Sequence, residues 1–269
     1  MLADGKPTDS GGLTHPRIAF GSASQRSQLR SSTVRSATAP FEEYVAGLRA
    51  AREIRSLPSN LTPEQAFLFT QRPLPGGDSI AANQKPREIV WLLDLLLKEP
   101  PRTVLEIGMD RGGTLFLWTR VAAPDALLIG VDFKRIHGRL GRYSPYALVR
   151  RSFARDHQRV ELIGDADSHA ASTVERVRSL LGKRNVDFLF LDADHRYESV
   201  TRDFELYAPL VREGGLIAFH DVSPRSRQET EGTARFWVEL KETGETMECI
   251  DDGALGYGIG LLMVGAGGA

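Results

Sequence analysis

Two short phrases in the second half of the chain combine carboxylates with imidazoles, the side chains best suited to moving protons or holding metal ions. They are Asp192-Ala193-Asp194-His195 and His220-Asp221. Each follows an apolar run that predicts a buried strand, at 186–191 and 216–219. Because parallel strands end at one sheet edge, we expect the two phrases to converge on one pocket. There, an imidazole with an ordinary pKa of about 6.5 could act as a general base, or a divalent ion could hold a hydroxyl group and lower its pKa.

A third phrase, Val104–Thr114, indicates ligand binding. It reads as a buried strand that runs into a turn with glycines at 108 and 112, where the backbone can approach a ligand closely. Glu106 lies near the end of that strand. The spacing E-x-G-x-x-x-G-G-T differs from the G-x-G-x-x-G of dinucleotide-binding enzymes, in which backbone amides hold a pyrophosphate. It suits a ligand that has a cationic group and no phosphate.

Two further acids lie at expected strand ends. Asp132 closes the second strand, 24 residues after Gly108, where a carboxylate can accept hydrogen bonds from ribose hydroxyls. Asp165 ends the third strand, where a carboxylate can accept a hydrogen bond from an exocyclic amine. Asp132 by itself does not distinguish one nucleoside cofactor from another.

The elements that must position these residues alternate after residue 102. Continuous apolar runs separated by amphipathic helices indicate an α/β fold with a parallel sheet covered on both faces. The expected strands are 103–107, 127–131, 159–163, 186–191 and 216–219, followed by two that pair antiparallel, 246–250 and 258–264. The expected helices between and after them are 114–121, 170–181, 197–210 and 233–241.

The chain before residue 102 divides into two regions. Residues 1–40 are expected to be a disordered tail, since residues 11–40 hold six serines and four arginines but no acid. Residues 41–101 are expected to form cap helices, one starting at Phe41, one capped by Thr62 and one opened by Pro86. Residues 102–269 form the expected ligand-binding domain.

The glycine phrase resembles motif I of the class I S-adenosylmethionine-dependent methyltransferases. Asp132, the Gly164-Asp165 pair and the phrase 210–216 follow in that family's order, so the resemblance spans about residues 84–265. It implies a Rossmann-like, doubly wound, seven-stranded sheet of order 3-2-1-4-5-7-6, with strand 7 antiparallel and the cap helices in front. The residues that it implies for S-adenosylmethionine binding are Glu106, Gly108, Gly112, Thr114, Asp132, Asp165, Ala166 and Asp192.

The pattern D-x-x-H with a later acidic pair resembles metal-dependent sugar and natural-product O-methyltransferases, including the cephalosporin hydroxylase-like group. The resemblance implies that His195 is the general base and that Asp192 and Asp221 are metal ligands. The chain departs from the pattern at His220, 28 residues after Asp192, where the family has an acid. With His220 as third ligand, the mixed donor set favours Mn²⁺, Fe²⁺ or Zn²⁺ over Mg²⁺. His220 could instead be a hydrogen-bonded partner of Asp192, so whether a metal (Mg²⁺ or Mn²⁺) is bound stays open.

The expected reaction is methyl transfer to a hydroxyl group of a small molecule, a sugar or a specialised metabolite. By resemblance, Gln84 and Lys85 lie near the pocket mouth, and with Tyr143 they are the expected acceptor contacts. The segment Lys134–Arg159 holds eight Lys or Arg residues against one acid, which fits an anionic acceptor, an RNA or simply a solvated helix face. An RNA methyltransferase ranks last, because the net charge of the whole chain is −1.

Two other classes of protein remain open. An NAD-dependent oxidoreductase would share the sheet and Asp132, but G-x-G-x-x-G is missing after the first strand. A non-methylating protein of the same fold would keep the cofactor pocket without needing a base. The single cysteine, Cys249, excludes an internal disulfide framework. With no expected membrane span or secretion signal, we expect a cytoplasmic protein with a small-molecule partner and no membrane partner; a homo-oligomer is compatible with the sequence.

Overall fold

The computed structural model describes residues 39–77, 79–134, 144–225, 230–251 and 257–265. Pro40–Ala269 form one compact unit, so the cap helices and the sheet belong together. The expected tail, residues 1–40, lies almost entirely outside the described residues, as does Tyr143.

The sheet has seven strands in the order β3-β2-β1-β4-β5-β7-β6, as expected. Five strands pair in parallel: β1 (Thr103–Ile107), β2 (Leu127–Val131), β3 (Arg159–Ile163), β4 (Val186–Leu191) and β5 (Val211–His220). β7 (Ile259–Met263) lies antiparallel between β5 and β6 (Glu245–Cys249). The expected antiparallel seventh strand is confirmed.

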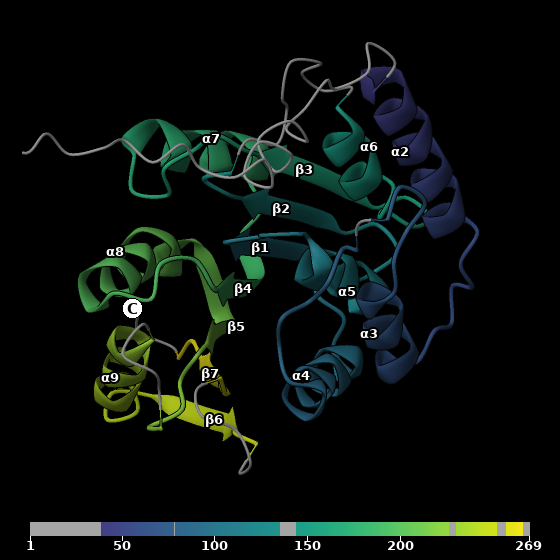
Figure 1. Cartoon of the computed structure of the whole chain (residues 1–269). Coiled ribbons are helices and arrows are strands. Elements are labelled where there is room, and N and C mark those ends of the chain that lie inside the picture. The colour runs from purple at the N-terminus through teal and green to yellow at the C-terminus, as the bar shows by residue number, and fades with distance from the viewer. Residues whose placement is uncertain (1–38, 78, 135–143, 226–229, 252–256, 266–269) are drawn as a thin grey trace, which may run out of the picture. The chain divides into compact units, whose positions relative to one another are not determined.

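Helices cover both faces of the sheet (Figure 1). One face carries α2 (Ala39–Arg55), α3 (Pro63–Gln71), α4 (Pro86–Lys98), α5 (Gly113–Val121) and α6 (Pro145–Arg151). The other face carries α7 (Ala171–Leu181), α8 (Tyr197–Tyr207) and α9 (Glu231–Leu240). Thr62 caps α3 as expected, with a reciprocal capping box to Gln65.

Alternation along each strand divides the apolar side chains between two cores, one on each face. On β4, Phe188 and Phe190 pack into the core that includes Phe116 and Trp118 of α5. Leu189 and Leu191 belong to the opposite core, with residues of α7, α8 and α9. This two-sided burial explains why the central strands read as continuous apolar runs.

Two elements differ from their expected bounds for identifiable reasons. The helix expected to reach residue 210 ends at Tyr207 and continues as a 3₁₀ turn, Ala208–Leu210, because Pro209 cannot donate an α-helical hydrogen bond. β5 starts at Val211 instead of 216, because the Gly214-Gly215 pair forms an irregularity within the strand and does not end it. There Gly214 has φ +70°, and the register with β4 shifts between Val186 and Phe188.

The order of the strands reverses between β1 and β4. From β1 the chain crosses one face through α5 to β2, whereas it returns from β3 to β4 through α7 on the other face. The connections therefore diverge between the carboxyl ends of β1 and β4, where open α/β sheets hold their ligands. Among the helices described, none combines the length and hydrophobicity that a membrane span requires.

Candidate functional site

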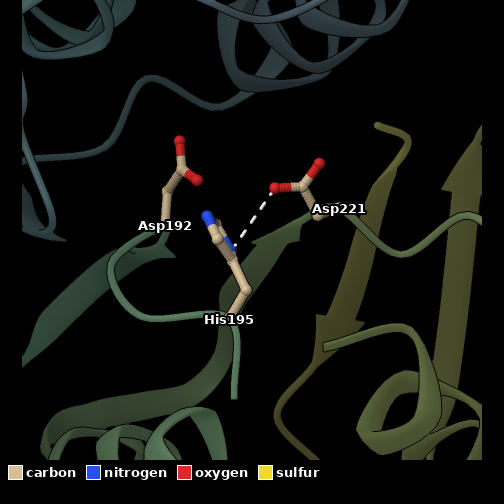
Figure 2. A group of neighbouring side chains, drawn as sticks. All are labelled: Asp192, His195 and Asp221. Atoms are coloured by element: carbon tan, nitrogen blue, oxygen red, sulfur yellow. Dashed lines mark ion pairs between the residues drawn. The ribbon is translucent and has the colours of Figure 1, made fainter. Parts of the chain in front are cut away.

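The carboxyl ends of β4 and β5 bring the expected acids and imidazoles together. Figure 2 shows the His195 ring between the carboxylates of Asp192 and Asp221. The His195 Nδ1 atom lies 3.4 Å from Asp221 Oδ2. The His220 Nδ1 atom lies 3.3 Å from Asp192 Oδ1 and 3.2 Å from Asp221 Oδ2. Asp221 therefore contacts both imidazoles, and His220 bridges both carboxylates.

His220 is almost fully buried, and the two carboxylates determine its charge. Burial alone would lower the pKa of His220, but Asp192 and Asp221 raise it well above its ordinary value. Burial would likewise raise the pKa of Asp221, but the hydrogen bond and charge of His220 bring it below its ordinary value. Both shifts favour an imidazolium between two carboxylates, which reduces the repulsion between them.

The segment after β6 supports this cluster. The Tyr257 backbone N–H donates to Asp221 Oδ1 at 3.2 Å, and the Tyr257 ring meets the His220 ring edge to face at 5.8 Å. Asp221 and Tyr257 both have left-handed backbones, with φ of +62° and +68°. Non-glycine residues adopt this conformation at a cost, and such residues cluster at functional sites.

Gln84 and Lys85, two of the residues expected to contact the methyl acceptor, lie at this cluster. The Gln84 side-chain amide donates from Nε2 to Asp192 Oδ2 at 2.8 Å, while its Oε1 is buried without a hydrogen-bond partner. The Lys85 ammonium lies 4.5 Å above the Tyr257 ring, within cation–π range. Gln84 therefore presents an unpaired acceptor beside Asp192, where a donor on a ligand would satisfy it.

Three side chains form a group that fits a divalent metal ion. Asp192, His195 and Asp221 each offer one ligand atom, and these atoms lie within 4.8 Å of one another. The group differs from the expected one in a single member, because His195 takes the place expected for His220. Two carboxylates and one imidazole suit Mn²⁺, Fe²⁺ or Zn²⁺ better than Mg²⁺.

The glycine turn after β1 lies directly against this cluster. Gly108 has φ +92°, and a Cβ atom there would lie 2.1 Å from the backbone oxygen of Asp192. Gly112, with φ +84°, opens α5, which begins at Gly113. Only glycine at position 108 lets the turn pass this close to the residue after β4. The glycine turn and the cluster of acids and imidazoles therefore lie together at the carboxyl edge of the sheet.

Asp132 is tied to the same turn. Its Oδ2 accepts the backbone N–H groups of Met109 at 2.8 Å and Asp110 at 2.7 Å, and its Oδ1 accepts that of Lys134 at 2.6 Å. An ionised carboxylate has about four acceptor positions. After these three bonds, Asp132 keeps one position for a ligand hydroxyl, so its expected ribose contact is compatible with a structural role.

A cavity of about 330 Å³ lies beside Asp132, within the size range of ligand pockets. Of the expected cofactor residues, Gly108, Asp132 and Ala166 line it, whereas Asp165 does not. Its remaining lining residues are Val131, Phe133, Asp167, Ser168, His169, Asp194 and Arg196. Sequence reasoning missed Phe133 and His169, although an aromatic residue directly after Asp132 was a usable signal.

Glu106 and Thr114 lie beneath the turn and do not line the cavity. Glu106 is fully buried, and its Oε1 accepts from Trp118 Nε1 at 3.1 Å. Burial raises the pKa of Glu106 to about 8, although hydrogen bonds from Thr114 and Trp118 oppose the shift. The expected direct contacts of these two residues with a cofactor stay predictions, and in the structure both support α5 under the turn.

Most of the described basic side chains of the segment 134–159 make hydrogen bonds or ion pairs with other parts of the protein. Arg155 donates to the backbone oxygens of Thr119 and Arg120, and Arg150 is buried with its guanidinium bonded to the Arg111 carbonyl. Lys134 pairs with Asp110. These contacts favour the structural reading of the basic residues over an RNA-binding surface.

Residues 105–222 match a family model described as a methyltransferase domain. The matched range starts in β1 and ends just after Asp221, so it contains the glycine turn, Asp132 and both groups of acids and imidazoles.

Two curated proteins match parts of the chain. An uncharacterized protein of Sinorhizobium fredii, y4gI, is 26% identical over 157 residues, or 56% of this chain. An uncharacterized protein of Acanthamoeba polyphaga mimivirus, R132, is 50% identical over 36 residues, or 13% of this chain. The chain spans only 16% of the length of each of these relatives.

Solved structures with similar folds include two O-methyltransferases. One is from Bacillus cereus in complex with SAH, at 14% identity and a TM-score of 0.49, covering 89% of this chain and 97% of that chain. The other is TomG of Streptomyces achromogenes, involved in tomaymycin synthesis and in complex with SAM, at 18% identity and a TM-score of 0.47. It covers 90% of this chain and 96% of that chain.

Proposed function

We propose that this chain, which carries a methyltransferase domain over residues 105–222, transfers the methyl group of S-adenosylmethionine to a hydroxyl group of a small molecule. The observation that supports the proposal most strongly is the contact between the glycine turn after β1 and the cluster of acids and imidazoles after β4 and β5. The glycine turn passes against the backbone of Asp192, and the same sheet edge carries an imidazole beside a carboxylate, His195 with Asp221. A cofactor site and a proton acceptor are thus adjacent.

The cavity beside Asp132 fits the nucleoside part of such a cofactor. Asp132 has an acceptor position for a ribose hydroxyl, and Phe133 offers an aromatic face that is 82% exposed. Gly108 keeps the turn next to the cavity free of a side chain. S-adenosylmethionine supplies a methyl group on a positively charged sulfur, and the acceptor oxygen displaces that sulfur as a neutral thioether.

His195 is the proposed general base. Its Nδ1 faces Asp221 at 3.4 Å, so an Nδ1–H directed at this carboxylate leaves the Nε2 lone pair to take the proton of the acceptor hydroxyl. The positive charge that His195 then gains is stabilised by Asp221. Gln84, Lys85 and Tyr257 surround the approach to Asp192 and are the proposed acceptor contacts, with Tyr143 as a further contact outside the described residues.

A divalent ion would be held by Asp192, His195 and Asp221 and would lower the pKa of an acceptor hydroxyl bound to it. In that form of the reaction, His195 would be a metal ligand and would not act as the general base. His220, the metal ligand expected from the sequence, has a different proposed role. Its bridge between the two carboxylates keeps them together, whether or not an ion is bound.

The decisive experiment measures S-adenosylhomocysteine formation with panels of glycosylated and phenolic acceptors, with and without a chelator. His195→Ala should lower kcat by about 10²- to 10⁴-fold, the contribution of a positioned general base, while the Kd for S-adenosylhomocysteine stays within about threefold of wild type. His157→Ala, which removes an exposed histidine outside the cavity, serves as the control.

Unchanged turnover in His195→Ala would remove this residue from the mechanism. Loss of activity with chelator, restored by Mn²⁺, would support the metal-assisted form of the reaction. Tight binding of NADH without binding of S-adenosylhomocysteine would overturn the proposal in favour of an oxidoreductase.

A further inference from the structure

One wall of the cavity beside Asp132 contains a histidine backed by a buried acid. His169, in the segment between β3 and α7, lines the cavity. Its Nε2 atom lies 3.3 Å from Oδ1 of Asp203, which is on α8 and only 2% exposed. The two atoms are not aligned as a hydrogen bond, and neither has another hydrogen-bond partner among the described residues. A small rotation of the ring would direct Nε2–H at the carboxylate.

Asp203 is itself held in place. The Ser168 side chain hydrogen-bonds to it, and the Tyr207 hydroxyl donates to the Ser168 carbonyl at 2.6 Å. On the cavity side, the His169 backbone N–H donates to Asp167 Oδ1 at 2.9 Å. Burial raises the pKa of Asp203, and the hydrogen bond from Ser168 opposes this shift. The histidine thus lies in a hydrogen-bonded segment in front of a buried carboxyl group.

We propose that His169 recognises the exocyclic amino group of the adenine ring and that Asp203 positions the imidazole for this contact. The inference rests on the proposed function, because adenosine must occupy this cavity. When Nε2–H is directed at Asp203, Nδ1 carries a lone pair. A lone pair accepts a hydrogen bond from an amino group but repels a carbonyl oxygen, so His169 would select adenine against a 6-oxopurine.

Other groups on the cavity wall contribute to binding in different ways. Phe133 can stack on any purine, since every base has an aromatic face. Asp132 is placed for the ribose, whereas Asp167 accepts the backbone N–H of His169 through one oxygen and keeps acceptor positions that an amino group can also use. His169 is the lining residue whose base-facing atom is set by a buried partner.

The test compares two ligands that differ at the relevant position of the base, S-adenosylhomocysteine and S-inosylhomocysteine. Isothermal titration calorimetry gives the Kd of each for wild type, His169→Ala, His169→Gln and Asp203→Asn. We expect wild type to prefer the adenosyl ligand by about tenfold or more, the scale of one hydrogen bond whose loss leaves a polar group unpaired. His169→Ala should bring the two Kd values to within about twofold of each other.

The additional variants keep the result interpretable. His169→Gln retains an acceptor oxygen and should keep part of the preference, and Asp203→Asn should reduce it by removing the charge that orients the ring. His157→Ala, an exposed histidine, should behave as wild type. A His169 that only ties the segment to α8 would alter the melting temperature and both affinities together, without changing their ratio.

An unchanged Kd ratio in folded His169→Ala would overturn the assignment, whatever the melting temperature. If wild type binds S-adenosylhomocysteine and His169→Ala has the same Kd ratio as wild type, only the proposed role of His169 fails. If wild type binds neither thioether, the proposed function fails first, and the assignment of His169 fails with it.

Discussion

At Asp192, three parts of the chain that are distant in sequence meet on one residue. Its Oδ2 accepts from Gln84, its Oδ1 lies next to His220, and its backbone oxygen lies against the glycine turn at Gly108. Replacing the Asp192 side chain would therefore disturb Gln84 and His220 at once, whereas the backbone contact with Gly108 would remain.

Glu106 should make the free energy of unfolding depend on pH. Burial raises its pKa from an ordinary value of 4.5 to about 8, so the folded state keeps a proton that the unfolded state releases within this window. The stabilising contribution of the protonated form is complete below pH 4.5 and is lost as the pH rises through about 8. The loss is on the order of several kcal/mol.

Glu106→Gln keeps the shape of the side chain and removes the titration. We expect urea denaturation at about pH 5 and about pH 8.5 to give more similar unfolding free energies for this variant than for wild type. Glu175→Gln, on the exposed face of α7, is the matched control and should keep the wild-type pH dependence. An identical pH dependence in wild type and Glu106→Gln would show that Glu106 is not the responsible group.

At the scale of elements, apolar periodicity predicted most strand and helix bounds to within one or two residues, because the central strands are buried on both faces. The glycines at 108 and 112 predicted the turn after β1. The shared edge of parallel strands predicted that Asp192, His195, His220 and Asp221 converge. The position of His169 on the cavity was not predictable in this way. It depends on how Asp203 of α8 packs behind the segment after β3, which is a long-range contact.

Two glycines with positive φ, Gly108 in the turn after β1 and Gly182 after α7, allow a steric conflict to be compared with a backbone cost alone. Gly182 has φ +62°, ψ −111° and open space around its Cβ position, so Gly182→Ala should cost only the backbone term, about 1–3 kcal/mol. Gly108→Ala adds a steric conflict with the Asp192 backbone oxygen and should cost about 3 kcal/mol or more. Gly108→Ala should also weaken S-adenosylhomocysteine binding, measured by calorimetry, whereas Gly182→Ala should not. Equal effects of the two substitutions would contradict the close approach.

Helix α4 holds the segment after β6 through one buried carboxylate. Glu88 is fully buried and accepts the backbone N–H groups of Asp251 at 2.8 Å and Gly258 at 3.0 Å. Sequence periodicity did not reveal this role, because an acid in the first turn of a helix usually serves the helix dipole. We call these two hydrogen bonds the Glu88 clamp. The clamp holds the backbone next to Tyr257, whose N–H donates to Asp221 and whose ring is a proposed contact of the methyl acceptor.

Glu88→Ala should leave one buried and one partly buried donor unpaired and lower the free energy of unfolding by about 2–4 kcal/mol. Because the clamp positions Tyr257, the acceptor KM should rise more than kcat falls. Asp94→Asn, on the exposed side of the same helix, is the control for both measurements. Wild-type stability and a wild-type acceptor KM in Glu88→Ala would contradict the proposal that Glu88 stabilises the fold and positions Tyr257.

At the scale of the whole molecule, the cap helices are part of the main core and not an appendage. Phe69 of α3 lies 5.2 Å from Phe116 of α5, ring centre to ring centre, and Leu92 and Leu93 of α4 are fully buried in the same core. Gly113, at the start of α5, leaves room for the backbone of Ile80–Ala82, which a Cβ atom would meet at 2.4 Å. The segment that leads to Gln84 is therefore packed against the start of α5, next to the glycine turn after β1.

This integration predicts one cooperative unfolding transition for cap helices and sheet, and the three tryptophans of the chain report on it from separate places. Trp91 is on α4, Trp118 on α5 against the sheet, and Trp237 on α9 at the opposite face. In variants that keep one tryptophan, with Phe in place of the other two, the urea midpoint from fluorescence should equal the midpoint from far-UV circular dichroism of the same variant. Each variant is its own reference, since Trp118 and Trp237 donate hydrogen bonds to Glu106 and Glu248, and their loss shifts absolute stability. A Trp91-only protein whose fluorescence midpoint falls clearly below its circular dichroism midpoint would mean that the cap helices detach first, and the acceptor contacts on Gln84 and Lys85 would then belong to a separately unfolding unit.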